Sequence, residues 1–233
     1  MINKRFVAIA SALALGVLIT GTALADAAAA SSAPAPANPQ VRVTTSMGSF
    51  TIELYADRAP LTVDNFLRYV REGQYTQTLI HRVIPNFLMQ GGGFAAADYS
   101  AKPTHPPVVN EAGNGLQNKR GWVGLARTAS AHSGNCQFYV NLADNPELDP
   151  LPVRWGYAVF GKVTDGMDVI DRIATVGTGA AGPFKSDAPL TPVVIQKIEV
   201  IDAAAAAAAA AAAPAAPPQL APPPTGNEVL APK

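Results

Sequence analysis

The residue with the clearest potential for chemistry is Arg82, which lies in the segment Ile80–Phe94, IHRVIPNFLMQGGGF. The apolar run Ile80–Ile84 predicts a strand, a Pro-Asn pair predicts a tight bend, and Phe87–Gln90 predicts a second short strand before three glycines. A permanently charged side chain within so apolar a segment needs an explanation.

Strand alternation predicts that Arg82 shares one face with Ile80 and Ile84, while His81 and Val83 occupy the other. A guanidinium on an apolar face is costly to bury without a partner. Arg82 is therefore either a core arginine held by an acid or a functional group in an apolar cleft. The spacing alone leaves both interpretations open.

Other reactive side chains form no convincing set. Cys136 is the sole cysteine, which excludes an internal disulfide, and its thiol is either buried and inert or reactive. The three histidines share no helix-face spacing, so no metal site is predicted. Ser130, His132, Ser133 and Asp144 are close in sequence, but no nucleophile-turn motif surrounds either serine, which makes a hydrolase a weak alternative.

The composition is that of a globular protein without a strong excess of either charge. Of the 233 residues 48% are hydrophobic and 15% are charged, which is enough to build a substantial core. The formal net charge is zero, so nothing indicates a phosphate-binding surface or a nucleic-acid partner.

Residues 1–25 have the layout of a cleavable signal peptide. Lys4 and Arg5 form a basic start, Phe6–Ile19 is apolar but short for a membrane span, and Ala23-Leu24-Ala25 fits the small-x-small cleavage pattern. We therefore expect export, with the periplasm as the location and full secretion as the alternative.

Both flanks of the central region are rich in alanine and proline. Residues 26–39 predict an extended linker, and residues 203–233 predict a disordered tail that begins with an alanine run. The folded domain is accordingly expected over residues 40–202.

Within that domain many short strands and two helices are expected. The clearest helix is Pro60–Glu72, where Val63, Phe66, Leu67 and Val70 form one apolar stripe. The other expected elements are strands Val41–Thr45, Phe50–Tyr55, Gly121–Ala126, Gln137–Leu142, Gly156–Val163 and Val193–Ile201, and a helix over Met167–Ile173, with a polar loop through Gly177, Gly179 and Gly182. Such spacing favours a mainly β fold with a closed or sandwiched antiparallel sheet and helices at its ends.

Four segments in the same order resemble the cyclophilin family of peptidyl-prolyl cis-trans isomerases, and its bacterial periplasmic branch in particular. They are IHRVIPNFLMQGG, NEAGNGLQNKRGWVGLAR, CQFYVNL and WGYAVFGKVTDGMDVID. The resemblance covers nearly all of Val41–Ile201. It implies a closed eight-stranded antiparallel β-barrel capped by two α-helices and a shallow outer groove for proline-containing polypeptides. The reaction requires no cofactor or metal, and nothing in the sequence demands more than a monomer.

The resemblance also assigns roles to residues. Arg82, Phe87 and Gln90 match the catalytic set, with Arg82 as the donor that stabilises the twisted amide and Gln90 as its orienting partner. The substrate-binding positions are His81, whose side chain points the other way, Leu88, Ala126, Arg127, Thr128, Gln137, Tyr139, Leu148 and Tyr157. Without the resemblance, plain core is the favoured interpretation of Phe87, Leu88 and Tyr139, and Gln90 reads equally as a residue that satisfies turn amides.

Two positions depart from the eukaryotic pattern. Glu147 stands where eukaryotic members carry a tryptophan important for binding cyclosporin, and Tyr157 replaces a histidine at the pocket rim. Neither is the arginine, so we expect isomerase activity with weak or absent cyclosporin binding. The alternative function is a chaperone or scaffold that binds proline-containing segments without essential turnover.

Overall fold

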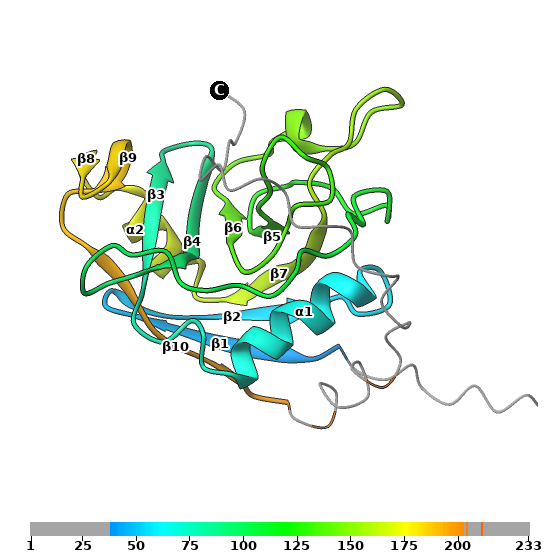
Figure 1. The fold of residues 1–233 in the computed structure, drawn as a ribbon, viewed down its shortest axis with the longest axis horizontal. Coiled ribbons are helices and arrows are strands. Elements are labelled where there is room, and N and C mark those ends of the chain that lie inside the picture. Colours follow the sequence, from blue (N-terminus) through cyan, green and yellow to red (C-terminus); the bar gives the residue numbers. More distant parts are fainter. Residues whose placement is uncertain (1–37, 203, 205–210, 212–233) are drawn as a thin grey trace, which may run out of the picture. The chain divides into compact units, whose positions relative to one another are not determined.

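The computed structural model describes residues 38–202, 204 and 211, and its central element is a closed barrel of eight antiparallel strands (Figure 1). Around the barrel the strands follow the order β1-β10-β3-β4-β6-β5-β7-β2. The predicted mainly β fold, with eight barrel strands and two helices, is confirmed. The predictions of a signal peptide over residues 1–25, of most of the linker and of a disordered tail lie outside the described residues.

The elements agree with the expected ones to within a few residues. The barrel strands are β1 (Gln40–Thr45), β2 (Gly48–Leu54), β3 (Thr78–Ile84), β4 (Leu88–Ala95), β5 (Trp122–Leu125), β6 (Phe138–Asn141), β7 (Val159–Asp165) and β10 (Val193–Val200). The helices are α1 (Pro60–Arg71), α2 (Met167–Ala174) and the short 3-10 helix η1 (Pro146–Leu148). None of the described helices is long and apolar enough to cross a membrane.

The predicted stripe of α1 is the face that packs on the barrel. Val63, Phe66, Leu67 and Val70 are all buried in the main core. The Phe66 ring meets Phe138 of β6 edge-on, with ring centroids 5.6 Å apart. The 3.6-residue period and the alternation along the strands thus build one core inside the barrel.

The first turn of α1 is capped by a residue from a distant loop. The helix carries proline at its start and no side-chain cap of its own. Glu111 fills that role, because its carboxylate accepts the backbone N–H of Leu61 at 3.2 Å and that of Thr62 at 2.8 Å. An acid at a helix N-terminus satisfies free donors and favours the helix dipole.

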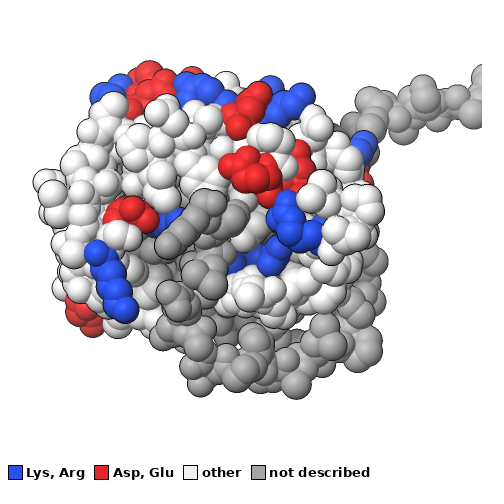
Figure 2. All heavy atoms as spheres, turned by 90° about the horizontal axis from the view of Figure 1, so that it is seen from above, with Lys and Arg blue, Asp and Glu red and all other residues white. Residues whose placement is uncertain are grey.

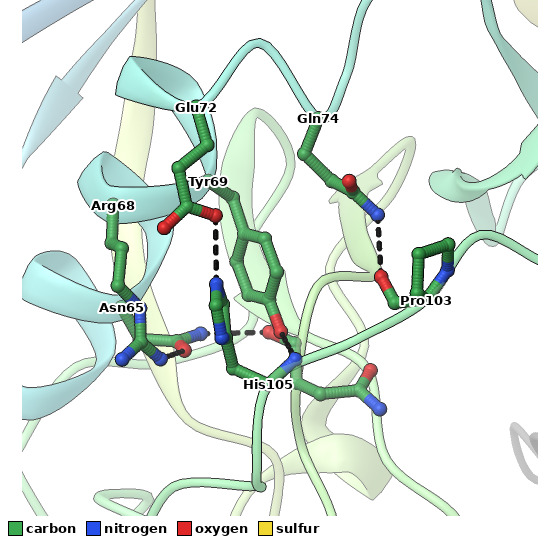
Figure 3. Close-up of polar contacts among 8 residues, drawn as sticks. Asn65, Arg68, Tyr69, Glu72, Gln74, Pro103 and His105 are labelled. Carbon is green, nitrogen blue, oxygen red and sulfur yellow. Dashed lines mark hydrogen bonds and ion pairs between the residues drawn. The ribbon is translucent and has the colours of Figure 1, made fainter.

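The outer side of α1 holds the long loop that follows β4 (Figure 3). The Tyr69 hydroxyl accepts the backbone N–H of His105 at 2.8 Å, and the His105 ring lies 2.7 Å from the Glu72 carboxylate. Gln74 donates to the Pro103 carbonyl at 2.7 Å. The irregular segment expected here is therefore anchored at several points around the C-terminal end of the helix.

Two expectations were wrong about the extent of the sheet. The three glycines after Gln90 do not end the second strand, because β4 continues through them to Ala95. The region expected as a polar loop after Gly177 contains a second, two-stranded sheet made of β8 (Thr178–Ala181) and β9 (Phe184–Pro189). Glycine-rich and polar sequences carry little strand signal, so only the pairing partners reveal these strands.

The predicted alternation along β3 is also wrong, and the reason matters for the site. The register shifts between Ile80 and Arg82, where three residues of β3 oppose two of β4. This bulge leaves both Ile80 and Val83 in the main core. Bulges re-aim side chains, and here Arg82 is released from the apolar face that simple alternation assigned to it.

Candidate functional site

A second cluster of buried apolar residues lies apart from the barrel core, and we call it the apolar site cluster. It consists of Leu88, Ala126, Tyr139, Leu148 and Tyr157, with Phe87 packed against it. All six are positions that the sequence analysis assigned to the site. Phe87, Leu88 and Tyr139 thus pack together in a small cluster outside the main core, and their part in substrate binding stays a prediction.

The Tyr139 ring is the floor of this cluster, and a glycine makes room for it. Gly124 is the β5 partner of Tyr139, and a Cβ at that position would stand 2.2 Å from the tyrosine ring. Tyr157 meets the Tyr139 ring edge-on at a centroid distance of 6.0 Å. Complete burial holds the pKa of Tyr139 well above its ordinary value, so its hydroxyl stays protonated.

A buried polar network behind the cluster holds its walls, and the sequence analysis did not find it. Asn118 accepts the Tyr139 hydroxyl at 2.6 Å. Asn145 donates to the Phe87 carbonyl at 2.8 Å and accepts the backbone N–H of Leu148 at 3.0 Å through its own carbonyl. Its backbone N–H in turn donates to the Asn118 carbonyl at 2.8 Å. One connected set of asparagines therefore positions three walls of the cluster.

Arg82 lies in a row of cross-strand neighbours that leads to the cluster. Arg82 of β3 pairs with Gln90 of β4, and Gln90 pairs with Tyr139 of β6. Directly paired residues share a face, and adjacent strands are about 4.8 Å apart. The guanidinium and the aromatic floor thus flank Gln90, roughly 10 Å apart along the row.

The guanidinium is partly buried and incompletely paired. Its side chain is 19% exposed, and Nε lies 3.7 Å from the Asp187 carboxylate, which β9 supplies. Burial lowers the pKa of Arg82, and the Asp187 charge opposes that shift, so the group remains a cation at any working pH. Nη1 is buried and finds no hydrogen-bond partner among the described residues. The partial pairing with an acid agrees with the first interpretation left open by the spacing, and the functional role in the second stays a prediction.

Gln90 is buried, and it is held by a second site residue. Its amide donates to Gln137 at 2.9 Å, which brings the two predicted glutamines together. Among the described residues, no side-chain hydrogen bond is seen between Gln90 and Arg82, which are cross-strand partners. Gln90 thus stands beside the guanidinium as its cross-strand partner, with its amide turned to Gln137.

The segment 126–128 is well ordered by its own contacts. The backbone N–H of Ala126 donates to the Gln137 carbonyl at 2.9 Å, and that of Thr128 donates to the Ser133 hydroxyl at 2.9 Å. The Arg127 guanidinium lies 4.3 Å from the centre of the Tyr157 ring. Since those two donors are engaged, this segment has only its remaining backbone groups to offer a ligand.

His81 does not join the apolar site cluster. Its ring stacks on Phe184 of β9 at 5.3 Å and meets Phe94 edge-on at 4.7 Å. Burial lowers the pKa of His81 to about 3, so the ring is neutral. The predicted orientation away from Arg82 is consistent with this packing, and the assignment to substrate binding has no contact that supports it.

The face seen in Figure 2 carries no large patch of a single charge. On the face seen in Figure 2, acidic and basic side chains are interspersed with uncharged ones. Among the described residues no group of three His, Cys, Asp or Glu side chains is placed to hold a metal ion. What the site does offer is the partly buried Arg82, the Arg127 guanidinium over Tyr157, two amide side chains and an apolar floor.

Solved structures of the same fold exist. A crystal structure of a Cryptosporidium parvum cyclophilin type peptidyl-prolyl cis-trans isomerase, determined in the presence of the dipeptide Ala-Pro, aligns with a TM-score of 0.60 and 22% sequence identity. The alignment covers 70% of this chain and 99% of that one. At this identity the match concerns the fold.

Sequence comparison is more specific. The chain is 48% identical over 161 residues to peptidyl-prolyl cis-trans isomerase A of Dickeya dadantii, covering 69% of this chain and 84% of the relative. It is 45% identical over 159 residues to peptidyl-prolyl cis-trans isomerase B of Escherichia coli, covering 67% of this chain and 96% of the relative. The model of the cyclophilin type peptidyl-prolyl cis-trans isomerase family matches residues 40–200. The chain therefore belongs to the cyclophilin-type peptidyl-prolyl cis-trans isomerases.

Proposed function

We propose that this protein accelerates X-Pro isomerisation in polypeptides that fold in the bacterial envelope, with Arg82 as the catalytic donor. The observation that carries the proposal is the buried Nη1 of Arg82, which has no partner among the described residues and stands in one row with the aromatic floor. An unsatisfied buried donor is costly, and a ligand acceptor at this place would satisfy it.

The chemistry of the reaction fits such a donor. Rotation about an X-Pro bond breaks amide resonance at a barrier of about 18–20 kcal/mol, so the uncatalysed step takes tens to hundreds of seconds. In the twisted transition state the proline nitrogen regains a lone pair, which the planar ground state scarcely presents. A fixed cationic donor that bonds this lone pair stabilises the transition state selectively.

Each neighbour has a part in this arrangement. The proline ring would lie on the apolar site cluster, where Tyr139 and Phe87 limit its movement and exclude water. The relative solved in the presence of Ala-Pro supports a ligand of this kind. The Gln90–Gln137 pair would bond the client backbone and hold it against rotation. Asp187 would keep the guanidinium in place through Nε and leave Nη1 for the ligand.

The decisive experiment is the rate of cis-trans exchange in a short Ala-Pro peptide, measured by NMR with the parent and with Arg82→Ala. Loss of one preorganised donor of this kind costs about 100- to 1,000-fold in rate, and we expect kcat/KM to fall by about 100-fold. Arg172→Ala is the matched control, because Arg172 also pairs with an aspartate but is 53% exposed on α2. A variant lacking Arg82 that is as fast as the parent would refute the assigned role.

The envelope location rests on the layout of residues 1–25 and has its own test. Mass spectrometry of the exported protein should find a new N-terminus at Asp26, after the Ala23-Leu24-Ala25 pattern. A protein that retains Met1 and stays in the cytoplasm would contradict this part of the proposal and leave the isomerase activity unaffected.

A further inference from the structure

The loop Asp149–Gly156 starts and ends at the apolar site cluster. It connects Leu148 of η1 to Tyr157, and the Tyr157 backbone N–H donates to the Leu148 carbonyl at 2.9 Å. In Figure 1 it belongs to the yellow-green chain that precedes β7. Since both residues at its base are walls of the cluster, the loop is continuous with the predicted proline pocket.

The tip of this loop is a closed turn. Leu151 and Arg154 exchange both backbone hydrogen bonds, at 2.9 and 3.0 Å, with Pro152-Val153 between them. The Arg154 guanidinium reaches back and donates to the carbonyls of Glu147 at 2.6 Å and Asp149 at 3.1 Å. These contacts tie the tip to the base.

A second set of contacts fixes the returning arm. Arg127 donates to the Trp155 carbonyl at 2.7 Å and to the Gly156 carbonyl at 3.1 Å, while its guanidinium lies over Tyr157. The Trp155 ring packs edge-on against His132 at 4.9 Å. The same arginine thus holds the loop and lies on a wall of the cluster.

This ordered loop presents three apolar side chains to solvent. Val153 is 94% exposed, Leu151 54% and Trp155 50%. Together with Gly113 the loop lines a surface hollow of about 400 Å³. Single exposed apolar residues are ordinary, but a contiguous group beside a binding site marks an interaction surface.

We propose that the loop Asp149–Gly156 is a second binding surface for the client polypeptide, which takes a bulky apolar side chain while the client's proline occupies the apolar site cluster. This inference rests on the proposed function. Val153 is four residues from Tyr157, and an extended chain spans at most about 3.6 Å per residue, so the tip is within about 14 Å of the cluster. The recognised residue would therefore lie within about four positions of the proline.

The size of the surface favours a client over a second copy of this chain. Even an aromatic side chain buries only about 150–250 Å² when fully covered. Since Leu151 and Trp155 are already about half covered, the three side chains together would contribute on the order of 300 Å². A stable protein interface needs roughly 800 Å² per partner. A short apolar segment already held by its proline needs much less, because the second contact is then intramolecular.

The test compares two peptides that share one Ala-Pro core and differ at a single position, leucine or serine, four residues from the proline. One pair of peptides carries the varied residue on the N-terminal side of the proline, and a second pair carries it on the C-terminal side. The parent should show a kcat/KM about fivefold higher for the leucine peptide of one pair, the scale expected for partial burial of one such side chain. The double variant Leu151→Ser/Val153→Ser should lose that preference and keep its rate on the serine peptide.

Leu190→Ser is the matched control, since Leu190 is 61% exposed at the end of β9, outside this loop. It should keep the leucine preference. A parent that isomerises all peptides equally, or a double variant that still prefers leucine, would overturn the inference and leave the proposed function standing. Absence of turnover with every peptide would instead overturn the proposed function. Concentration-dependent dimers of the parent that the double variant abolishes would show a self-association surface and refute the client role.

Discussion

The hydrogen bond between Tyr139 and Asn118 provides a quantitative test of how the pocket floor is held. Both side chains are buried, and the tyrosine hydroxyl donates to Asn118 Oδ1 at 2.6 Å. Asn118→Ala leaves this hydroxyl without its acceptor in a site closed to water. Asn141, which also donates to Asn118 Oδ1, keeps its bond to the Trp122 carbonyl at 3.1 Å.

The magnitudes follow from these contacts. An orphaned buried hydroxyl costs about 1–3 kcal/mol, and the lost Asn118–Asp149 side-chain bond adds about 1 kcal/mol. We therefore expect Asn118→Ala to lower the free energy of unfolding by about 2–4 kcal/mol. Tyr139→Phe removes the donor and leaves Asn118 Oδ1 bonded to Asn141, so it should cost only about 1 kcal/mol.

The double variant separates this account from simple loss of packing. Once the Tyr139 hydroxyl is absent, Asn118→Ala leaves no buried hydroxyl without an acceptor. The double variant should therefore lose about 1–2 kcal/mol less free energy of unfolding than the sum of the two single losses. Urea unfolding followed by the fluorescence of Trp122 and Trp155 measures each value by linear extrapolation. Tyr139→Phe should keep the isomerisation rate within about threefold, because the ring remains.

The control cycle pairs Asn118→Ala with Tyr69→Phe, whose hydroxyl bonds the His105 backbone on the outer side of α1. Those two costs should add within about 0.5 kcal/mol. If the Asn118 and Tyr139 costs are equally additive, the reasoning about the orphaned hydroxyl is wrong.

Three further predictions concern buried positions. Burial lowers the pKa of His81 from 6.5 to about 3, so between these two values only the unfolded chain takes up this proton. As the pH falls below 6.5, the free energy of unfolding should therefore decrease by up to about 1.4 kcal/mol per pH unit. If the free energy of unfolding of the parent minus that of His81→Phe does not change down to pH 4, this expectation is wrong. Burial raises the pKa of the Cys136 thiol to about 12, so an aromatic disulfide reagent at pH 8 should label it only in urea, and rapid labelling of the folded protein would show an accessible thiol. Gly92 has φ +91°, and a Cβ there would lie 2.8 Å from the Tyr75 ring. Gly92→Ala should therefore lower the free energy of unfolding by about 2 kcal/mol or more. An unchanged urea midpoint would refute the packing argument.

The local sequence pattern was sufficient to predict most of the helices and barrel strands. The stripe Val63, Phe66, Leu67 and Val70 predicted α1 and its buried face, because helix periodicity involves only residues within two turns of one another. The strand runs predicted most of the barrel for the same reason. Assigning Phe87, Leu88 and Tyr139 to a candidate site required the motifs, since no other property of the sequence separates these residues from the main core.

Features that depend on distant partners were missed. The strands β8 and β9 have little strand propensity and are recognisable through their mutual pairing. The asparagines Asn118 and Asn145 look like turn residues in the sequence and become a buried network only when three segments converge.

The sequence by itself determined that Arg82 is a cation in an apolar segment, and the family motifs indicated the reaction for which we propose it as the donor. Only the tertiary structure decided what surrounds the arginine. A bulge in β3 breaks the alternation, and β9 brings Asp187 to Nε while Nη1 faces no partner among the described residues. The physical reason is that a charge is stabilised by whatever lies within a few ångströms of it, and those neighbours come from other parts of the chain.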